Sequence, residues 1–214
     1  RGVHDASTAE LAVGLAISSR RGFPEFMREQ IAGNWSHHRT AALSDSKIGI
    51  VGFGSIGKKI AQNLSGFEVS ITAFTQSGRD GSLTIDQLDE HLPNLDIVIL
   101  ILPLSDSSRH LFNAERLSKM KDGALLINVA RGPVVDTDAL VKELNSGRIF
   151  AALDVTDPEP LPSDHPLWSA KNVQIVPHIG GNSEAFEPRG RSLIESQLKL
   201  LAAGKPLEHV VAQG

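Results

Sequence analysis

Apolar residues along this chain occur in two arrangements, as short continuous runs and at spacings of three or four. The clearest run, residues 96–102, is Ile, Leu and Val after a single Asp, as in a strand buried on both faces. Further strands are expected at 48–51, 69–74, 124–128, 149–154 and 173–176, and helices at 6–20, 24–32, 58–64, 83–90, 114–120, 137–145 and 184–203. Strands that alternate with helices predict an α/β fold in which helices cover both faces of a parallel sheet.

Capping residues define several of these boundaries. Ser7 or Thr8 is expected to cap the first helix, and Asp136 is expected to cap the helix that Gly147 ends. Pro188 is expected to interrupt the first turns of the last helix, because proline lacks the N–H that a helix interior uses.

Two polar segments are expected to be loops. Residues 157–166 contain four prolines, which predicts a rigid loop. In the stretch 35–40, His37 and His38 are adjacent and cannot share one face of a helix or strand. A solvated loop is therefore favoured over a metal site there, and we predict no metal site in the chain.

A glycine pattern follows the first expected strand. Gly52, Gly54 and Gly57 have the spacing G-x-G-x-x-G and lie between a strand and a helix, the context that the motif requires. In a dinucleotide site the first glycine permits a tight turn, the second lets the backbone approach a pyrophosphate, and the third lets helix and strand pack closely. The phosphates lie at the helix N-terminus, where free N–H groups attract negative charge. An ordinary turn is the alternative, but the pattern favours a Rossmann-type, doubly wound sheet.

Composition excludes several kinds of function. The 214 residues are 41% hydrophobic and 21% charged, which suits a globular protein with a substantial core. A net charge of −4 gives no electrostatic case for binding nucleic acid or an anionic membrane. The absence of cysteine rules out disulfides and thiol chemistry, and we expect a cytoplasmic protein. The sequence has no apolar run long enough to span a membrane and no signal peptide, although Arg1 is not a natural start and upstream residues are expected to be absent.

The end of the second expected strand bears on the choice of nucleotide. Sites that prefer NAD(H) usually place Asp or Glu there, about 20 residues after the glycine motif, to bind the ribose 2′-hydroxyl. Here the stretch contains Thr75, Gln76, Ser77 and Arg79. A 2′-phosphate would meet hydroxyls, an amide and a guanidinium there, so we expect NADP(H) to be favoured over NAD(H). Asp80 comes after the turn and is not assigned to the site, and a solvated Arg79 with loose selectivity is the alternative.

Three residues with complementary chemistry follow the last three expected strands. Arg131, Glu159 and His178 lie in these segments, and ligands bind beyond the carboxyl ends of parallel strands. Arginine can hold a carboxylate with two parallel hydrogen bonds, and histidine can transfer a proton near neutral pH. A neighbouring carboxylate favours the imidazolium form and fixes its orientation. Together the three suit carbonyl reduction beside a nicotinamide, although each alone could be an ordinary ion pair, loop charge or capping residue.

Short motifs, spread over almost the whole chain, occur in an order typical of one enzyme family. They are VGFGSIG at 51–57, LPLS at 102–105, RHLFN at 109–113, the run 128–136, LDV at 153–155 with EP at 159–160, and PHIGG at 177–181. The chain thus resembles the D-isomer-specific 2-hydroxyacid dehydrogenases. The resemblance implies that Arg131 binds the substrate carboxylate and carbonyl, that His178 is the general acid and base, and that Glu159 is its partner.

The resemblance extends the expected nucleotide site beyond the glycines. Asp154 is expected to face the nicotinamide carboxamide, and Leu102 with Pro103 is expected to line the adenosine side. The complete expected site is Gly52, Gly54, Ser55, Ile56, Gly57, Thr75, Gln76, Ser77, Arg79, Leu102, Pro103, Ala130, Asp154 and Gly180. Thr75 in place of the family's usual acidic residue resembles the glyoxylate/hydroxypyruvate reductase-like members that prefer NADPH.

The resemblance also implies a domain organisation. Residues 1–187 are expected to form the dinucleotide-binding domain, with the helices in 6–32 serving a homodimer. Residues 188–214 are expected to be a helical segment that returns to a smaller substrate domain, most of which is expected to be missing from this chain.

We therefore expect an oxidoreductase that transfers hydride between NADP(H) and a small 2-hydroxy or 2-oxo acid such as glyoxylate or hydroxypyruvate. The alternatives are a phosphoglycerate dehydrogenase-like enzyme, a nucleotide-sensing protein like the family's corepressors, and a piece that binds nucleotide without activity. Turnover of a 2-oxo acid distinguishes an enzyme from a nucleotide sensor.

Overall fold

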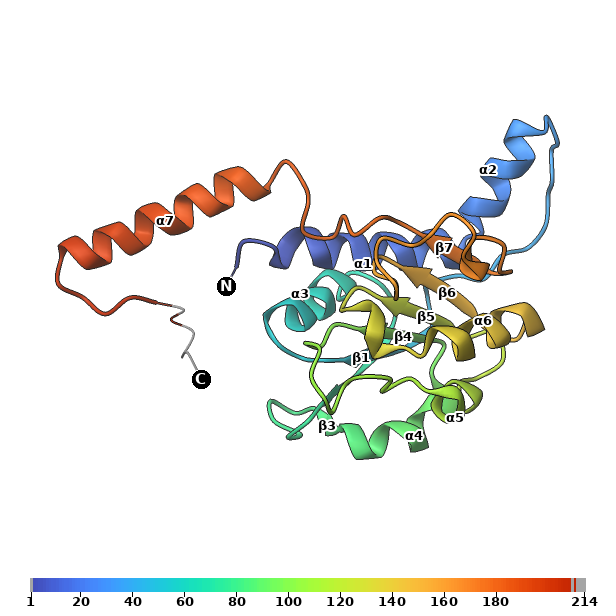
Figure 1. Cartoon of the computed structure of the whole chain (residues 1–214), viewed down its shortest axis with the longest axis horizontal. Coiled ribbons are helices and arrows are strands. Elements are labelled where there is room, and N and C mark those ends of the chain that lie inside the picture. Colours follow the sequence, from blue (N-terminus) through green and yellow to red (C-terminus); the bar gives the residue numbers. More distant parts are fainter. Residues whose placement is uncertain (1, 209, 211–214) are drawn as a thin grey trace.

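The computed structural model describes residues 2–208 and 210, and its centre is a seven-stranded parallel sheet (Figure 1). The strands are β1 (Lys47–Val51), β2 (Ser70–Thr75), β3 (Leu83–Thr84), β4 (Ile97–Leu100), β5 (Leu125–Asn128), β6 (Phe150–Leu153) and β7 (Val173–Ile175). Their order is β3-β2-β1-β4-β5-β6-β7, so the direction in which the sheet grows reverses between β1 and β4. This order confirms the doubly wound, Rossmann-type fold, and such a reversal is where these sheets bind ligands.

Helices cover both faces of the sheet, as predicted. The α-helices are α1 (Asp5–Arg20), α2 (Phe23–Ile31), α3 (Ser55–Leu64), α4 (Leu88–His91), α5 (Ala114–Ser118), α6 (Thr137–Ser146) and α7 (Phe186–Ala202). Four 3-10 turns join them, η1 (Ile85–Gln87), η2 (Leu92–Asn94), η3 (Gly132–Val134) and η4 (Pro166–Trp168). Helices α1 and α3 share one buried cluster with the strands, and α4, α5 and α6 share another on the opposite face.

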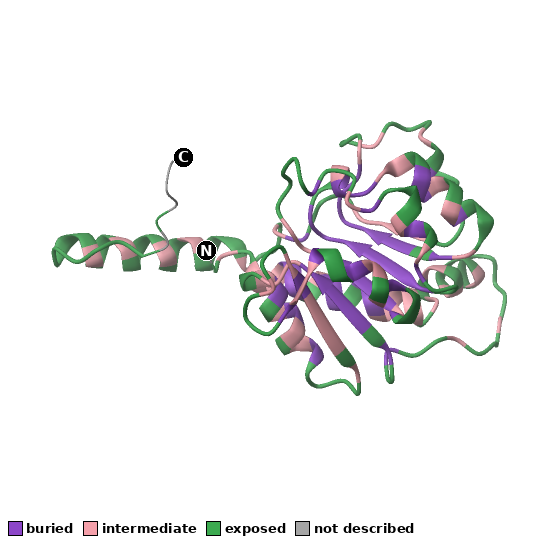
Figure 2. Cartoon of the chain, turned by 90° about the horizontal axis from the view of Figure 1, so that it is seen from below, coloured by how far each residue is buried: buried purple, intermediate pink, exposed green. Residues whose placement is uncertain are grey.

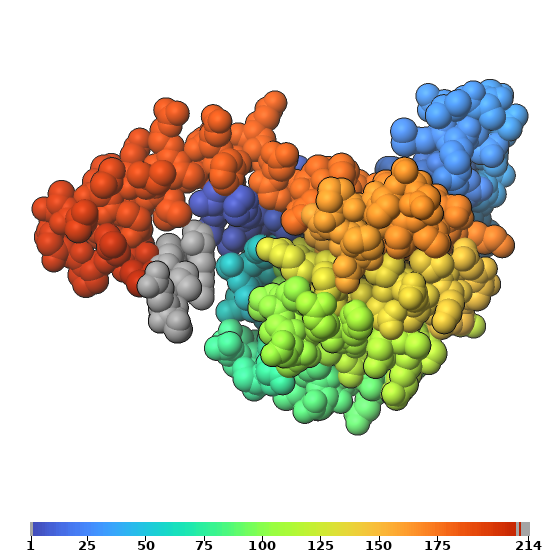
Figure 3. All heavy atoms as spheres, in the orientation of Figure 1, coloured from blue at the N-terminus to red at the C-terminus, as the bar shows by residue number. Residues whose placement is uncertain are grey.

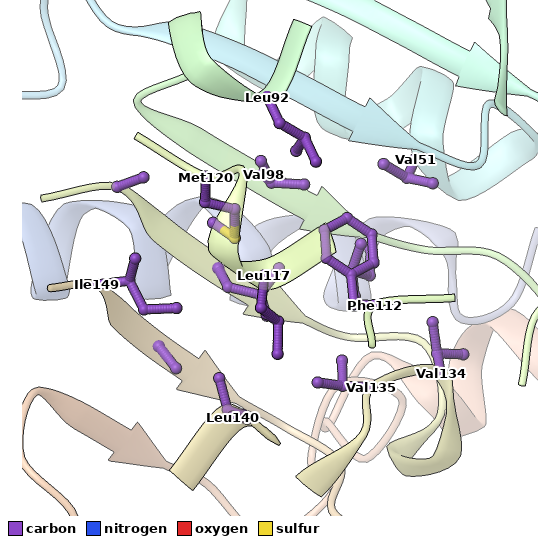
Figure 4. Close-up of a cluster of buried hydrophobic side chains, with 14 of the residues drawn as sticks. Val51, Leu92, Val98, Phe112, Leu117, Met120, Val134, Val135, Leu140 and Ile149 are labelled. Atoms are coloured by element: carbon purple, nitrogen blue, oxygen red, sulfur yellow. The ribbon is translucent and has the colours of Figure 1, made fainter. Parts of the chain in front are cut away.

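Strand β4 is apolar throughout because both of its faces are buried. Ile97 and Ile99 face the cluster under α1 and α3, whereas Val98 and Leu100 face the other cluster. Figure 4 shows this second cluster, in which Val98 lies among side chains from the neighbouring helices and loops. Alternate residues of a strand point to opposite faces, so a strand covered on both sides must be apolar at every position. Most strands are correspondingly buried in Figure 2.

Two predicted helix caps are confirmed and one is wrong. The Asp136 carboxylate accepts a hydrogen bond from the Ala139 N–H at 3.0 Å, and Gly147 ends α6 with φ of 79°. Helix α1, however, begins at Asp5, ahead of the expected caps Ser7 and Thr8. Thr8 instead lies buried inside the helix, where its hydroxyl donates to the Gly180 carbonyl at 3.1 Å. A tertiary contact, rather than the helix end, uses this side chain.

Two further local expectations are wrong, one because of a tertiary contact and one because of where a helix begins. The expected helix at 83–90 begins with two strand residues, because Leu83 and Thr84 pair with the end of β2 as β3. Pro188 does not interrupt α7, since it is the third residue of the helix. The first-turn N–H groups of a helix have no partner within it, so proline is accommodated there.

Two helices extend from the body of the molecule. Figures 1 and 3 show α7 standing away at one end, and α2 with the segment that follows it protruding at the other. Neither helix buries any residue that the structure describes. Over the described part of the chain, the helices lack the combination of length and apolar character that crossing a membrane requires.

Candidate active site

Two adjoining clefts lie at the carboxyl ends of the strands, where the sheet order reverses between β1 and β4. The first, of about 830 Å³, is bordered by the glycine turn and the segment after β2. The second, of about 630 Å³, is bordered by the segments that follow β5, β6 and β7. Both clefts are lined by Gly54, Ser55, Ile101, Leu102 and Pro103. They therefore form one elongated crevice that passes over the glycine turn.

Each glycine of the motif has a distinct structural role. A side chain on Gly52, whose φ is 102°, would place its Cβ 2.4 Å from the Ile101 carbonyl oxygen. The Cβ of a residue at Gly57 would lie 2.2 Å from the Gly52 oxygen, so the strand and helix α3 can approach only through glycine. At Gly54, by contrast, a Cβ would meet no described atom within 4 Å. That open space borders the crevice at the start of α3, where a pyrophosphate would be held.

The segment after β2 forms the outer wall of the first cleft. Thr75, the last residue of β2, lines this cleft together with Gln76 and Arg79, whereas Ser77, also expected to bind the nucleotide, is exposed and is not among the lining residues that the structure describes. The Thr75 hydroxyl accepts a hydrogen bond from the Gly78 N–H at 3.0 Å, and its oxygen lies 2.7 Å from the Ser82 Oγ. Thr75 therefore shapes the turn as well as lining the cleft.

The segment after β5 carries Arg131 at the inner end of the crevice. The Asn128 side chain braces this segment, accepting from the Ala130 N–H and donating to the Arg131 carbonyl, each at 3.0 Å. One guanidinium nitrogen of Arg131 donates to the Ala130 carbonyl at 2.6 Å. The remaining guanidinium N–H groups can bind an anion, since Arg131 is exposed and lines the second cleft.

Asp154 holds the turn that presents the histidine. It is 3% exposed, and its carboxylate accepts hydrogen bonds from the Ile179 N–H at 2.7 Å and the Gly180 N–H at 3.1 Å. Its backbone carbonyl accepts from the His178 N–H at 2.8 Å. A side chain on Gly180 would place its Cβ 2.8 Å from this carboxylate, so the close contact requires glycine.

His178 and Glu159 are in direct contact at the mouth of the second cleft. The Nδ1 of His178 lies 2.5 Å from the Oε1 of Glu159, and both side chains remain partly open to solvent. With Nδ1 bound to the carboxylate, Nε2 is the nitrogen available to a ligand. The structure thus brings Arg131, Asp154 and His178 to one cleft, with Glu159 behind the imidazole.

A comparison with protein families identifies the family of this chain. Residues 13–180 match the model described as D-isomer specific 2-hydroxyacid dehydrogenase, NAD binding domain. The chain belongs to this dehydrogenase family. The matched residues include the glycine turn, Arg131, Glu159 and His178, so the match covers both ends of the crevice.

Individual relatives agree with this assignment. The dehydrogenase chain is 41% identical to the glyoxylate reductase of Thermofilum pendens, over 95% of this chain and 63% of that protein. It is 32% identical to a D-isomer specific 2-hydroxyacid dehydrogenase from Xanthobacter autotrophicus Py2 solved with NADPH and MES, with a TM-score of 0.84 over 99% of this chain and 89% of that one. It is 30% identical to the NAD-dependent formate dehydrogenase of Staphylococcus aureus in complex with NAD, with a TM-score of 0.84 over 100% of this chain and 67% of that one.

These comparisons identify the dehydrogenase chain as a domain for a nicotinamide dinucleotide and leave the choice between NAD and NADP open, because both nucleotides occur among its relatives. The chain spans between 41% and 71% of the length of eight curated relatives. Within residues 2–208 and 210, no three His, Asp or Glu side chains are grouped as ligands for a metal ion.

Sequence reasoning missed several residues that shape the crevice, and four of them, Asn128, Lys58, Thr8 and Asp80, show how such residues can be overlooked. Asn128 could have been found from the sequence. An Asn side chain commonly accepts a hydrogen bond from the backbone N–H two residues further on and so forms a turn, as Asn128 does with Ala130. Lys58, which lines the first cleft, directly follows the last glycine of the motif and so also had a local signal. Thr8 and Asp80 had none, since Thr8 contacts a residue 172 positions away and Asp80 enters the cleft only through the coiling of its loop.

Proposed function

We propose that this domain serves an oxidoreductase that transfers hydride between NADP(H) and a small 2-hydroxy or 2-oxo acid, such as glyoxylate or hydroxypyruvate. The observation that carries the proposal is that Arg131 and His178 line one cleft with the glycine turn, while Glu159 is bonded to His178. A cation for the substrate carboxylate and a proton donor are thereby available at one end of a nucleotide crevice. The name of the Thermofilum relative, glyoxylate reductase, supports the same substrate class.

Each of the three residues has a defined role in this reaction. Arg131 holds the carboxylate of the 2-oxo acid and polarises the adjacent carbonyl. His178, as imidazolium, gives a proton from Nε2 to the carbonyl oxygen as that oxygen becomes a hydroxyl, and it takes the proton back in the reverse direction. Glu159 balances the imidazolium charge and fixes the orientation of the ring through Nδ1. The bound nicotinamide supplies the hydride for reduction and accepts it for oxidation.

The remaining residues of the crevice hold the nucleotide. Gly52, Gly54 and Gly57 bring the pyrophosphate to the N-terminus of α3, where Ser55 and Ile56 form the first turn. All five further residues line the second cleft. Leu102 and Pro103 would flank the adenosine, Ala130 and Gly180 would border the nicotinamide half, and the Asp154 carboxylate would serve as acceptor for the carboxamide. A carboxylate has about four lone-pair sites, so two backbone hydrogen bonds leave Asp154 able to accept another.

NADP(H) is the favoured nucleotide in this proposal. The position at the end of β2 that commonly carries Asp or Glu is Thr75, and Gln76, Ser77 and Arg79 follow it. Arg79 supplies a guanidinium to a 2′-phosphate, and Gln76 supplies an amide N–H. The NADPH complex of the Xanthobacter relative supports this preference, and the NAD complex of the Staphylococcus relative keeps NAD(H) as the competitor.

The domain division is also a proposal. Residues 1–187 form the dinucleotide-binding domain, and residues 188–214 belong to the substrate domain of the whole protein, although 1, 209 and 211–214 lie outside the described residues. Helix α7 supports this division, because Ile194, Leu198 and Leu201 are each about 60% exposed on it. An apolar face of this kind favours a covering partner.

The protein is proposed to form a homodimer, with the helices within 6–32 at the interface. Phe23, Met27 and Ile31 follow one another at intervals of four along α2, which puts them on one face, and all three are exposed. A second copy of the chain would cover this row. The cytoplasmic location expected from the cysteine-free composition stays a prediction.

The proposed function is tested by following NADPH oxidation by the full-length protein with glyoxylate and with hydroxypyruvate. The variant His178→Ala should lower kcat by about 100- to 10,000-fold, because proton transfer to the oxygen is lost. Its affinity for NADPH, measured by cofactor fluorescence, should stay the same. Wild-type turnover in this variant would remove His178 from the role, and NADPH binding without turnover in the wild type would favour a nucleotide-sensing protein.

A further inference from the structure

The loop between β2 and β3 coils back toward the start of α3. Gly78, Asp80 and Gly81 all have positive φ, of 65°, 57° and 74°, which turns the chain tightly on itself. The Ser82 hydroxyl donates to the Arg79 carbonyl at 2.6 Å and also bonds to the Thr75 hydroxyl. These contacts tie both ends of the loop together and carry Asp80 into the first cleft.

Asp80 meets a lysine there. The Lys58 Nζ lies 2.8 Å from the Asp80 Oδ2, and each side chain is about half exposed. Lys58 belongs to the first turns of α3, immediately after the last glycine of the motif. The hydrogen bond and charge of Lys58, with the charge of Arg79, hold the pKa of the Asp80 carboxyl below its ordinary value. The cleft therefore contains one carboxylate and two cations at neutral pH.

The carboxylate and the two cations have opposite effects on the binding of NAD(H) and of NADP(H). A ribose 2′-hydroxyl needs an acceptor, and a carboxylate is a good one. A 2′-phosphate needs cations and is repelled by a carboxylate. While Lys58 is paired with Asp80, the carboxylate offsets the charge that Lys58 offers to a phosphate and also repels that phosphate, whereas a hydroxyl can bind Asp80 with the ion pair intact.

We propose that Asp80 is a specificity-determining residue. Its carboxylate competes with the 2′-phosphate of NADP(H) for Lys58, and this competition reduces the preference of the crevice for NADP(H) over NAD(H). The inference rests on the proposed function only in so far as the crevice binds a dinucleotide. Thr75, the position singled out in the sequence, carries no carboxylate, and the coiled loop brings one into the cleft from Asp80, five residues further along the chain. Selectivity in this chain thus depends on the Lys58–Asp80 pair together with Arg79.

The test uses 2′,5′-ADP and ADP, which probe the adenosine end without hydride chemistry, titrated calorimetrically into the chain at fixed ionic strength. The variant Asp80→Asn should bind 2′,5′-ADP about tenfold more tightly, because Lys58 is released to the phosphate. Its affinity for ADP should stay the same or fall. The variant Lys58→Met should bind 2′,5′-ADP more weakly than the wild type. Adding Asp80→Asn to Lys58→Met should raise the affinity for 2′,5′-ADP by less than Asp80→Asn raises it in the wild type.

Asp86→Asn is the matched control, because it removes the same charge from an exposed position outside the described lining of the cleft. An unchanged ratio of the two affinities in Asp80→Asn, or an equal change in Asp86→Asn, would overturn the inference while leaving the dinucleotide site intact. Failure of the wild type to bind either nucleotide would instead overturn the dinucleotide site of the proposed function, and the inference with it.

Discussion

The Nδ1 of His178 and the Oε1 of Glu159 lie 2.5 Å apart, although 19 residues and a proline-rich loop separate them in the chain. The histidine has a positive φ of 54°, and its N–H donates to the Asp154 carbonyl. The imidazole is therefore held both through its backbone, by the turn after β7, and through its ring, by Glu159. This double restraint fixes which nitrogen faces the crevice.

The first prediction concerns the ring contact. In Glu159→Gln, the imidazolium loses its ion-pair partner while a hydrogen-bonding side chain of the same size remains. We expect kcat for 2-oxo acid reduction to fall about 10- to 100-fold, with little change in the affinity for NADPH. Steady-state kinetics and a fluorescence titration measure the two quantities. Unchanged turnover would show that Glu159 has no part in the reaction.

The second prediction separates the glycines that the fold requires from the glycine that the ligand requires. Gly54→Ala should lower the free energy of unfolding by no more than about 1 kcal/mol, because Gly54 is the N-cap of α3 and the added methyl meets no described atom within 4 Å. It should weaken binding of NADPH by tenfold or more, an order-of-magnitude figure, because the methyl occupies the space that the pyrophosphate approaches. Urea denaturation and a fluorescence titration distinguish the two effects.

Gly66→Ala is the control for that substitution. Gly66 also has no described atom within 4 Å of an added Cβ, but it follows α3 at the end remote from the glycine turn. It should change neither stability nor binding. If both variants bind NADPH equally well, the role given to Gly54 is wrong.

The third prediction is a pH dependence of stability. Burial tends to raise the pKa of the Asp96 carboxyl, but hydrogen bonds from Lys121 and the Lys47 N–H hold it below its ordinary value of 3.8. A carboxyl whose pKa is lowered by folding stabilises the protein above the unfolded-state pKa, and the contribution is lost as the pH falls through the folded-state value. Asp96→Asn should therefore cost about 1–2 kcal/mol at pH 7. The difference from wild type should shrink as the pH falls below 3.8.

Urea denaturation at neutral and acid pH measures this difference. Asp122→Asn is the control, because Asp122 is 85% exposed and lies 3.4 Å from Arg148. An exposed ion pair contributes about 0–1 kcal/mol, so this control should change little at either pH. A pH-independent cost in Asp96→Asn would contradict the electrostatic explanation.

The fourth prediction concerns the exposed row on α2. Met27→Glu places a charge in the middle of Phe23, Met27 and Ile31, which the proposed homodimer would cover. We expect the dissociation constant of the dimer to rise by tenfold or more, an order-of-magnitude figure, because the charge would be buried without a partner. Sedimentation velocity measures it. Arg28→Glu, next to this row but outside it, should leave the dimer largely intact, and equal effects of the two variants would argue against the row as the interface.

The sequence by itself determined the architecture and the main chemical groups of this protein. An apolar run such as that of β4, a glycine turn at Gly52–Gly57 and a cap at Asp136 are local signals. Each depends on the conformations and burial of neighbouring residues, so each can be recognised without knowing where the rest of the chain goes. For the same reason the sequence predicted that Arg131, Glu159 and His178 would follow strands that end at one edge of the sheet.

Only the tertiary structure decided which of these groups meet, and how. Thr8 lies inside a helix and bonds to Gly180, Leu83 and Thr84 form a strand at the sheet edge, and Asp80 reaches the cleft beside Lys58. These outcomes depend on contacts between distant segments or on the path of a coiled loop, and local propensities do not encode either. The sequence therefore determined that a nucleotide crevice would form, while the packing of its loops decided the balance of charges inside it.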